Sequence, residues 1–222
     1  MGEIRTKDGQ YVGEVANEDL FGKPFLCVYG KNKPRGWDES VIEMKIAEGL
    51  TAYVRFNTSE KLNKVLEQDA RNKGLAQVAG SFLAKREMLD TLGIDEIELF
   101  RRARENTTPK VANMGDVLAK MGCPFPITEE SPLSVVTARE RDAYGAGILA
   151  NKLALKALHQ QIGDYTIIPS SIHEIIVIPE ELASGIPFLS DMIRDVNATE
   201  VADSDVLSDN AYKYDNKGLH IA

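Results

Sequence analysis

The chain has 222 residues, of which 43% are hydrophobic and 27% are charged, a composition that supports a sizeable core and argues against global disorder. Its formal net charge is −8, which disfavours nucleic-acid binding, because contacts with phosphates require clustered Lys and Arg. The length allows one large domain or two small ones.

The cysteines and histidines show no pattern that is typical of a metal or disulfide site. Cys27 and Cys123 lie far apart and belong to no Cys-x-x-Cys pair. His159, His173 and His220 have no partner at a recognised ligand spacing. We therefore expect no metal, no cofactor and a reducing compartment such as the cytoplasm. We also expect neither a signal peptide nor a membrane span, because no apolar run approaches the roughly 18 residues that a span requires.

The N-terminal half contains apolar runs that are typical of strands. Residues 11–15, 25–29 and 50–56 predict three strands, the last from alternating apolar positions. A glutamate follows Ser40 by three residues, the spacing of a capping box, which predicts a short helix through Glu48.

Two further helices are predicted in the middle of the chain. Ser59 is expected to begin one of them, and Asp95, with a glutamate three residues later, is expected to begin the other. The second helix should end at 106–109 and bury an apolar face. Residues 75–85 fit either a helix or a strand. The expected apolar face consists of Ile97, Leu99, Phe100 and Ala103.

A proline-rich segment divides the predicted organisation. Residues 124–132 hold three prolines in nine positions and are interpreted as a linker between an N-terminal region, 1–123, and a C-terminal domain, 133–222. The predicted fold class is α+β, a mixed sheet with helices packed on it and a C-terminal unit of the order β-β-α-β-β-α-β. Its predicted elements are a strand at 133–137, an apolar segment at 145–150, helices at 151–161 and 187–197, and strands at 167–170, 172–178 and 211–214.

The best candidate site lies between the strands predicted at 167–170 and 172–178. Ser170, Ser171, His173 and Glu174 interrupt two β-branched apolar runs. If the second run is a regular strand, His173 and Glu174 point to opposite faces. His173 with either serine could form a polar functional site. The structural alternative, which we favour, is that these side chains satisfy backbone groups at a corner between strands.

The last part of the chain is strongly acidic. Between Glu180 and Asp215 there are nine acidic residues against Arg194 and Lys213. Asp203, Asp205 and Asp209 are spaced like calcium ligands, but the glycine and the closing glutamate of an EF-hand loop are missing. We interpret them as an acidic surface, which could also meet a basic partner.

Nucleotide-binding and hydrolase motifs are not found. Gly145-Ala146-Gly147 lacks the strand–GxGxxG–helix context, and the sequence has neither a Walker A motif nor a Gly-x-Ser-x-Gly elbow. No complete set of nucleophile, base and orienting residue can be assembled from sequence motifs.

Five stretches together resemble one family. Residues 165–179, with Pro-Ser-Ser-Ile-His-Glu at their centre, are similar to the signature of an uncharacterised bacterial family of unknown function, found mainly in anaerobic Gram-positive bacteria. Residues 196–201 and 206–215 resemble its closing motifs, residues 99–109 resemble its middle section, and Gly145-Ala146 with the following apolar run is similar to its pattern. The resemblance implies a bacterial cytoplasmic domain and transfers no catalytic residue.

We therefore predict a non-catalytic module that binds a protein or a small ligand through the face holding Ser170, Ser171 and His173. Two alternatives stay open. The first is a small hydrolase or transferase that uses His173 with Ser170 or Ser171. The second is an acidic inhibitor from a mobile element that acts by charge mimicry. We expect a protein partner in preference to nucleic acid and no membrane partner, and we leave a homo-oligomer open.

Overall fold

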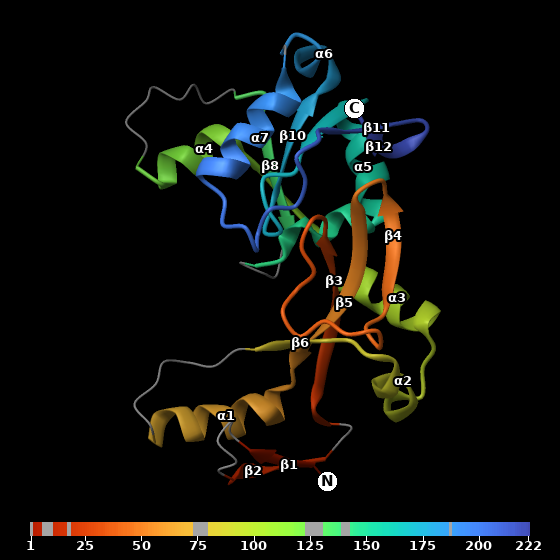
Figure 1. Ribbon diagram of the computed structural model, residues 1–222, viewed down its shortest axis with the longest axis vertical. Coiled ribbons are helices and arrows are strands. Elements are labelled where there is room, and N and C mark those ends of the chain that lie inside the picture. The colour runs from red at the N-terminus through yellow and green to blue at the C-terminus, as the bar shows by residue number, and fades with distance from the viewer. Residues whose placement is uncertain are drawn as a thin grey trace. The chain divides into compact units, whose positions relative to one another are not determined.

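The computed structural model describes residues 2–5, 11–16, 19–72, 80–122, 131–138, 143–186 and 188–222 (Figure 1). Contacts between residues divide the chain into two compact units, and each is built from several stretches of sequence. Unit 1 comprises Met1–Phe25, Gly36–Ile42 and Val54–Asn106, and unit 2 comprises Leu26–Arg35, Glu43–Tyr53 and Thr107–Ala222.

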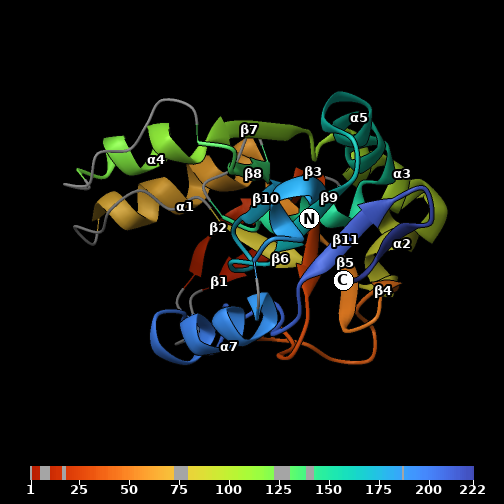
Figure 2. The ribbon, with the colours of Figure 1, turned by 90° about the horizontal axis from the view of Figure 1, so that it is seen from above.

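Unit 2 is organised around a six-stranded sheet in which every neighbouring pair is antiparallel. The predicted α+β class is confirmed, but this sheet is not mixed. Figure 2 shows it from above. The strands, in their order across the sheet, are β12 (Gly218–Ile221), β11 (Tyr212–Asp215), β9 (Tyr165–Ile168), β10 (Ile175–Pro179), β8 (Ser134–Ala138) and β7 (Pro109–Asn113).

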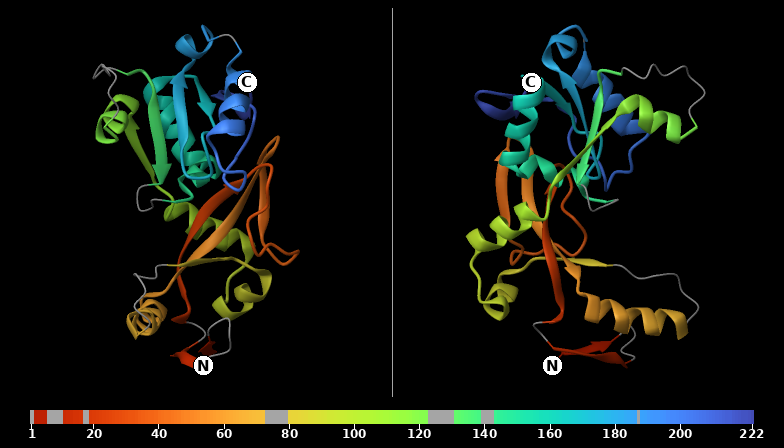
Figure 3. Two further views of the ribbon diagram at one scale, coloured as in Figure 1. Left: turned by 60° about the vertical axis from the view of Figure 1, so that its left-hand side comes forward. Right: turned by 180° about the vertical axis from the view of Figure 1, so that it is seen from behind.

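The two faces of this sheet are covered by different helices. The hydroxyl of Tyr165 donates to the carbonyl of Leu155 in α5 (Lys152–Ile162), so this face of β9 packs on α5. The next residue, Thr166, points to the opposite face, where it lines a hollow together with Leu189 of α7 (Leu189–Thr199). Helices α5 and α7 therefore lie on opposite faces, as the views in Figure 3 also show.

The face that packs on α5 forms the core of unit 2. Tyr165, Ile167, Ile175 and Val177 are fully buried on the two central strands. Ile176 points to the α7 side and is only partly buried. Strands β9 and β10 pair as predicted, with Ile168 opposite Ile176, but the segment between these two residues is a turn. The predicted alternation through His173 and Glu174 is therefore wrong.

The helices at 151–161 and 187–197 are confirmed as α5 and α7, with bounds shifted by one or two residues. The Asn151 side chain accepts from the Ala154 N–H and donates to the Thr107 carbonyl, so it both caps α5 and anchors it. The apolar segment of the predicted β-β-α-β-β-α-β order is a buried 3-10 helix, η2 (Gly145–Ala150), not a strand. Strands β7 and β12 and helices α4 (Met114–Lys120) and α6 (Glu180–Ala183) were not predicted.

The apolar side chains of α5 and α7 are only partly covered. Leu155 is buried on α5, whereas Leu153 on the same helix is 70% exposed. On α7 the buried residues are Ile193 and Asn197. A helix that packs on one face of a sheet buries only part of its own circumference. An apolar residue in the sequence therefore does not show by itself which side of the helix is buried.

Unit 1 contains the hairpin of β1 (Gly2–Arg5) and β2 (Tyr11–Val15) together with β6 (Ser81–Leu83) and the helices α1, α2 and α3. Ser59 and Asp95 begin α1 and α3 as predicted, since their side chains accept from the N–H of Leu62 and Glu98. Ile97 is 81% exposed and does not belong to the buried face of α3. Residues 75–79 of the ambiguous segment lie outside the described residues. The helices span Glu60–Asn72 (α1), Arg86–Leu92 (α2) and Glu96–Glu105 (α3).

Strands β3 (Phe21–Tyr29) and β5 (Leu50–Thr58) each contribute residues to both units, and β4 (Glu43–Ala47) pairs antiparallel with β5. The predicted helix over 40–48 is therefore wrong. The Ser40 hydroxyl bonds to the Asp38 carboxylate and caps no helix. Gly49, with φ at +73°, allows the tight turn that returns β4 onto β5.

The proline-rich segment separates two strands that pair with each other. Strand β7 lies before it, β8 lies after it, and their register runs from Pro109↔Ala138 to Asn113↔Ser134. Residues 123–130, which include Cys123 and most of the predicted linker, lie outside the described part of the chain, and the two units do not follow the division into 1–123 and 133–222. Cys27 is buried. Among the described helices, none has the length and apolar character needed to cross a bilayer.

Candidate functional site

The turn between β9 and β10 brings the four predicted site residues together. The hydroxyls of Ser170 and Ser171 both donate to Oε1 of Glu174, at 3.2 and 3.1 Å. The Ser171 hydroxyl also accepts from the N–H of His173 at 3.0 Å, the geometry of a serine turn. We name these four residues the polar turn. Because they do not lie on a regular strand, they share one local network.

The imidazole of His173 is held between two other segments. Its Nδ1 accepts from the N–H of Tyr144 at 3.3 Å, and its Nε2 lies 3.5 Å from Oδ2 of Asp205. In the neutral ring this arrangement assigns the proton to Nε2, where it faces the carboxylate. The side chains of His173 and Asp205 are each 34% exposed. Sequence reasoning missed this pair, because 32 positions separate the two residues and no local signal connects them.

Backbone groups of the polar turn join three distant segments. The N–H of Ile172 donates to the carbonyl of Asp205 at 3.0 Å, and the N–H of Ala146 donates to the carbonyl of Ile172 at 3.2 Å. The Thr137 hydroxyl donates to the carbonyl of His173 at 3.1 Å. The turn thus ties β8, η2 and the loop after α7 to the centre of the sheet.

Two glycines allow η2 to lie very close to β8, β3 and the polar turn. A Cβ on Gly145 would lie 1.8 Å from Oγ1 of Thr137 and 2.3 Å from the carbonyl oxygen of His173. A Cβ on Gly147 would lie 2.0 Å from the carbonyl oxygen of Leu26. The Gly-Ala-Gly sequence therefore serves packing of the 3-10 helix against β8, β3 and the polar turn.

The three aspartates of the predicted acidic surface have separate partners. Asp205 faces His173, while the carbonyl of Asp203 accepts from the Asn32 amide at 2.7 Å. Oδ1 of Asp209 accepts from the amide of Asn197, at 2.9 Å. In the described part of the chain, no three His, Cys, Asp or Glu residues are grouped so that they could hold a metal ion.

The chemistry open to the polar turn is limited by its hydrogen bonds. Nucleophilic catalysis requires a base that accepts the proton of the serine hydroxyl. Both serine hydroxyls donate to Glu174, whereas the His173 ring faces Tyr144 and Asp205. A hollow of about 320 Å³ between β7, β8 and α5 is lined by other residues, among them Val111, Val136 and Leu158. The acceptor of both serine hydroxyls is therefore the Glu174 carboxylate and not the His173 ring.

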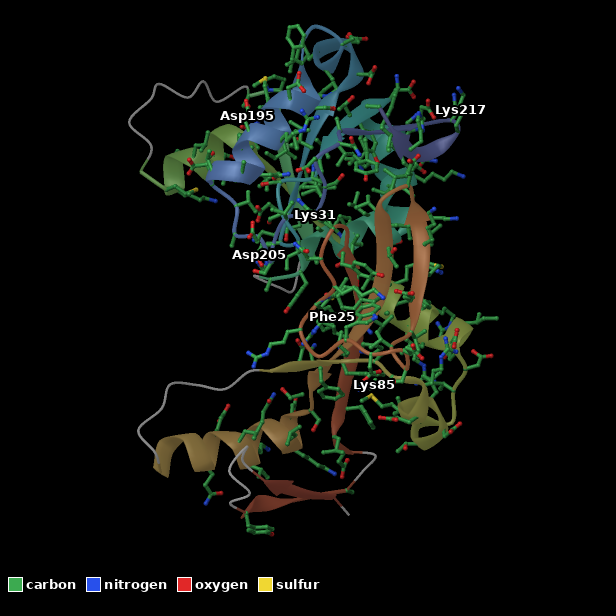
Figure 4. All side chains as sticks on the ribbon, viewed as in Figure 1. Phe25, Lys31, Lys85, Asp195, Asp205 and Lys217 are labelled. Carbon is green, nitrogen blue, oxygen red and sulfur yellow. The ribbon has the colours of Figure 1, made fainter. Side chains whose placement is uncertain are left out.

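A second region of unit 2 carries exposed apolar side chains in place of hydrogen-bonded polar ones. Phe188, Met192 and Val196 are 77%, 54% and 51% exposed and follow one another at intervals of four residues. Met192 and Val196 are one turn apart and lie on one side of α7. Phe188 is the N-cap residue that precedes the helix, with φ at +60°, so the row runs from this end of α7 to Val196. Asp191 and Asp195, also exposed, run beside the row. We name these five residues the α7 surface; Asp195 is labelled in Figure 4.

A hollow of about 360 Å³ lies at the N-terminal end of the α7 surface. It is lined by Ala183, Phe188 and Leu189, together with the carboxylate-bearing Glu180 and Asp191. Apolar residues at helical spacing, as in α7, usually indicate core. The two aspartates one turn apart within the same helix were the available sign that part of this face meets water.

Comparison with known proteins assigns the chain to a family. Neither a curated protein nor a solved structure matches it. The sequence model of a family of unknown function, DUF5688, matches residues 58–216, a range that contains the polar turn, both glycines of η2 and the α7 surface. Because this match covers more than half of the chain, the protein belongs to DUF5688, a family of unknown function.

Proposed function

We propose that the protein is a non-catalytic module that binds another protein, and that the α7 surface carries the contact. The observation behind this proposal is the row of three large apolar side chains that stay exposed while Ile193 and Asn197 on the other side of α7 are buried. Removal of apolar surface from water is favourable by about 25 cal/mol per Å², part of which is offset by the entropy lost on association. A continuous exposed apolar patch with a polar border is typical of protein–protein contact sites.

In this proposal the polar turn supports the binding surface. It holds the loop after α7 through the Ile172–Asp205 backbone bond and the His173–Asp205 pair. Asn197 of α7 is buried, and its amide donates to the carbonyl of Ser208 at 2.9 Å. These contacts hold α7 and its following loop against the sheet, so they fix the orientation of the exposed row.

Affinity capture from the host organism, with quantitative mass spectrometry, tests the proposal. The bait is the intact chain, its Met192→Asp/Val196→Asp variant, or a Leu153→Asp variant as the control. Leu153 is 70% exposed on α5, so the control places a charge on an apolar site of the opposite face. We expect proteins captured by the parent and the control to be lost from the α7 variant. Identical sets for all three baits would contradict the proposal.

The half-exposed His173–Asp205 edge favours a second candidate, a small hydrolase. Hydrolysis of p-nitrophenyl acetate separates the two candidates. We expect the parent protein to release nitrophenol no faster than its Ser171→Ala and His173→Ala variants. Turnover by the parent that both substitutions abolish, in variants that retain the parental circular dichroism spectrum, would favour the hydrolase instead.

A further inference from the structure

We infer that the α7 surface receives a basic amphipathic helix of the partner protein; this rests on the proposed binding function. The helical part of the row, from Leu189 at the start of α7 to Val196, rises about 10 Å. A row of this length matches two turns of a second helix, whose apolar side chains recur every three or four residues. The hollow beside Phe188 and Leu189 lies at the end of the row and has a mixed lining that includes Ser184, Ser190 and Asp191.

The charge around the row favours Lys and Arg on the partner. Asp191 and Asp195 are exposed beside Met192, and Glu200 and Asp203 are exposed just beyond the helix. The two basic residues of the acidic stretch already have partners. Arg194 pairs with Asp191 at 2.9 Å, and Lys213 pairs with Glu180 at 2.8 Å. The surface therefore presents an excess of negative charge to any incoming segment.

The same charge argues against two other occupants. In a symmetric dimer through this surface, the acidic strip of one copy would lie close to that of the other, and repulsion between like charges opposes such a contact. An anionic lipid surface would also be repelled. A basic segment gains from both parts of the surface, since its apolar side covers the row and its cations meet Asp195 and Glu200, whereas Asp191 is already paired with Arg194.

The first experiment uses defined peptides as probes. Fluorescence anisotropy measures binding of an 18-residue amphipathic peptide of Leu and Lys, a peptide with Glu in place of Lys, and a scrambled Leu/Lys peptide. We expect only the first to bind, and the affinity to fall as salt is raised, because the exposed charges become screened. Equal binding of the scrambled peptide would overturn the inference, since general attraction to an acidic protein would then suffice.

Matched variants locate the binding of the Leu/Lys peptide. Met192→Asp adds a negative charge yet should weaken binding about tenfold, because it interrupts the apolar row. Leu153→Asp adds the same charge on the opposite face and should change the affinity by less than about twofold. Asp195→Asn should weaken binding about threefold, whereas Asp116→Asn on α4 should not. If the two members of either pair behave alike, the inference fails.

Photo-crosslinking then separates failure of the inference from failure of the proposed function. A benzophenone amino acid replaces Met192 or, as the control, Leu153, and the crosslinked segment is sequenced by mass spectrometry. A basic amphipathic segment at position 192 alone supports the inference. An acidic or neutral partner segment overturns it but leaves protein binding standing. A crosslink to a second copy overturns it in favour of self-association, and equal products from both positions contradict the proposed function itself.

Discussion

The polar turn and the α7 surface differ in how their side chains are matched to their surroundings. In the polar turn, Ser170, Ser171 and Glu174 satisfy one another, and His173 is held by Tyr144 and Asp205. On α7, large apolar side chains meet water, and Ile193 and Asn197 are the residues of this helix that are buried. The polar residues, which first suggest a functional site, are therefore engaged within the fold. The apolar residues, which first suggest core, are available for a partner.

The two regions should therefore respond differently to substitution. Removing a group from the polar turn leaves its partner without a hydrogen bond, which lowers the free energy of unfolding. Substitution on the α7 surface removes few contacts within unit 2, so it should lower the affinity for a partner and not the stability of the fold. The predictions below test that difference, beginning with the largest expected loss of stability.

Gly145→Ala should be the most damaging single change near the polar turn. The new Cβ would overlap Thr137 and the His173 carbonyl, so η2 must move away from β8. We expect a loss of about 3 kcal/mol in the free energy of unfolding, measured by urea denaturation. Gly185→Ala is the control, since its Cβ would meet Leu182 at an ordinary 3.4 Å. Similar midpoints for the two variants would show that the junction is loosely packed.

Alkaline pH should destabilise the core before it affects the α7 surface. Burial, aided by the hydrogen bond to Glu43, raises the pKa of Tyr29 to about 12. Burial also raises the pKa of Tyr165 and of Tyr212. An unfolded tyrosine loses its proton near pH 10, so the unfolded state binds fewer protons above that pH. Stability should therefore be retained below pH 10 and fall between about pH 10 and 12.

Absorbance of tyrosinate near 295 nm, recorded with far-ultraviolet circular dichroism, checks this prediction. We expect some tyrosines to ionise only as the circular dichroism signal is lost. If all seven tyrosines titrate near pH 10 while the fold persists, the three named side chains are accessible to solvent and the core assignment is wrong.

Glu174→Ala should lower the free energy of unfolding by about 1–3 kcal/mol, because both serine hydroxyls lose their acceptor. Ser171→Ala should have a smaller effect in the same direction, since one hydroxyl and one cap of the His173 N–H are lost. Glu181→Ala, an exposed carboxylate on α6, should stay within about 0.5 kcal/mol of the parent. A Glu174→Ala protein as stable as the Glu181→Ala protein would mean that the polar turn contributes nothing to folding.

Met192→Asp should change stability least, by about 0.5 kcal/mol, while it removes partner capture. The next residue provides the contrast. Ile193 is buried on the same helix, and Ile193→Asp should cost several kcal/mol because it places a charge against the sheet. Thermal unfolding of the two variants measures the difference. A large destabilisation by Met192→Asp would show that this side of α7 is covered by the protein itself.

Signals that act over a few residues led to correct predictions. Asp95 and Asn151 begin helices where expected, since a side-chain oxygen and a nearby backbone N–H are sufficient for a cap. Strands β8, β9 and β10 follow from β-branched apolar runs, and β9 pairs with β10 because they are neighbours along the chain. For residues 40–48 the local signal, a capping-box spacing, led to a wrong prediction of a helix. Pairing of β4 with β5 outweighs the weak helical preference of this segment.

By itself, the sequence determined the α+β class, strands β8 to β11, helices α5 and α7, and the choice of Ser170, Ser171, His173 and Glu174 as the candidate site. Only the tertiary structure decided that Asp205 faces His173, that Gly145 must lack a Cβ, and that Met192 is exposed while Ile193 is buried. The physical reason is the separation along the chain between the groups that interact. Caps and strand propensities involve atoms a few residues apart, whereas these three outcomes depend on surfaces contributed by distant parts of the chain.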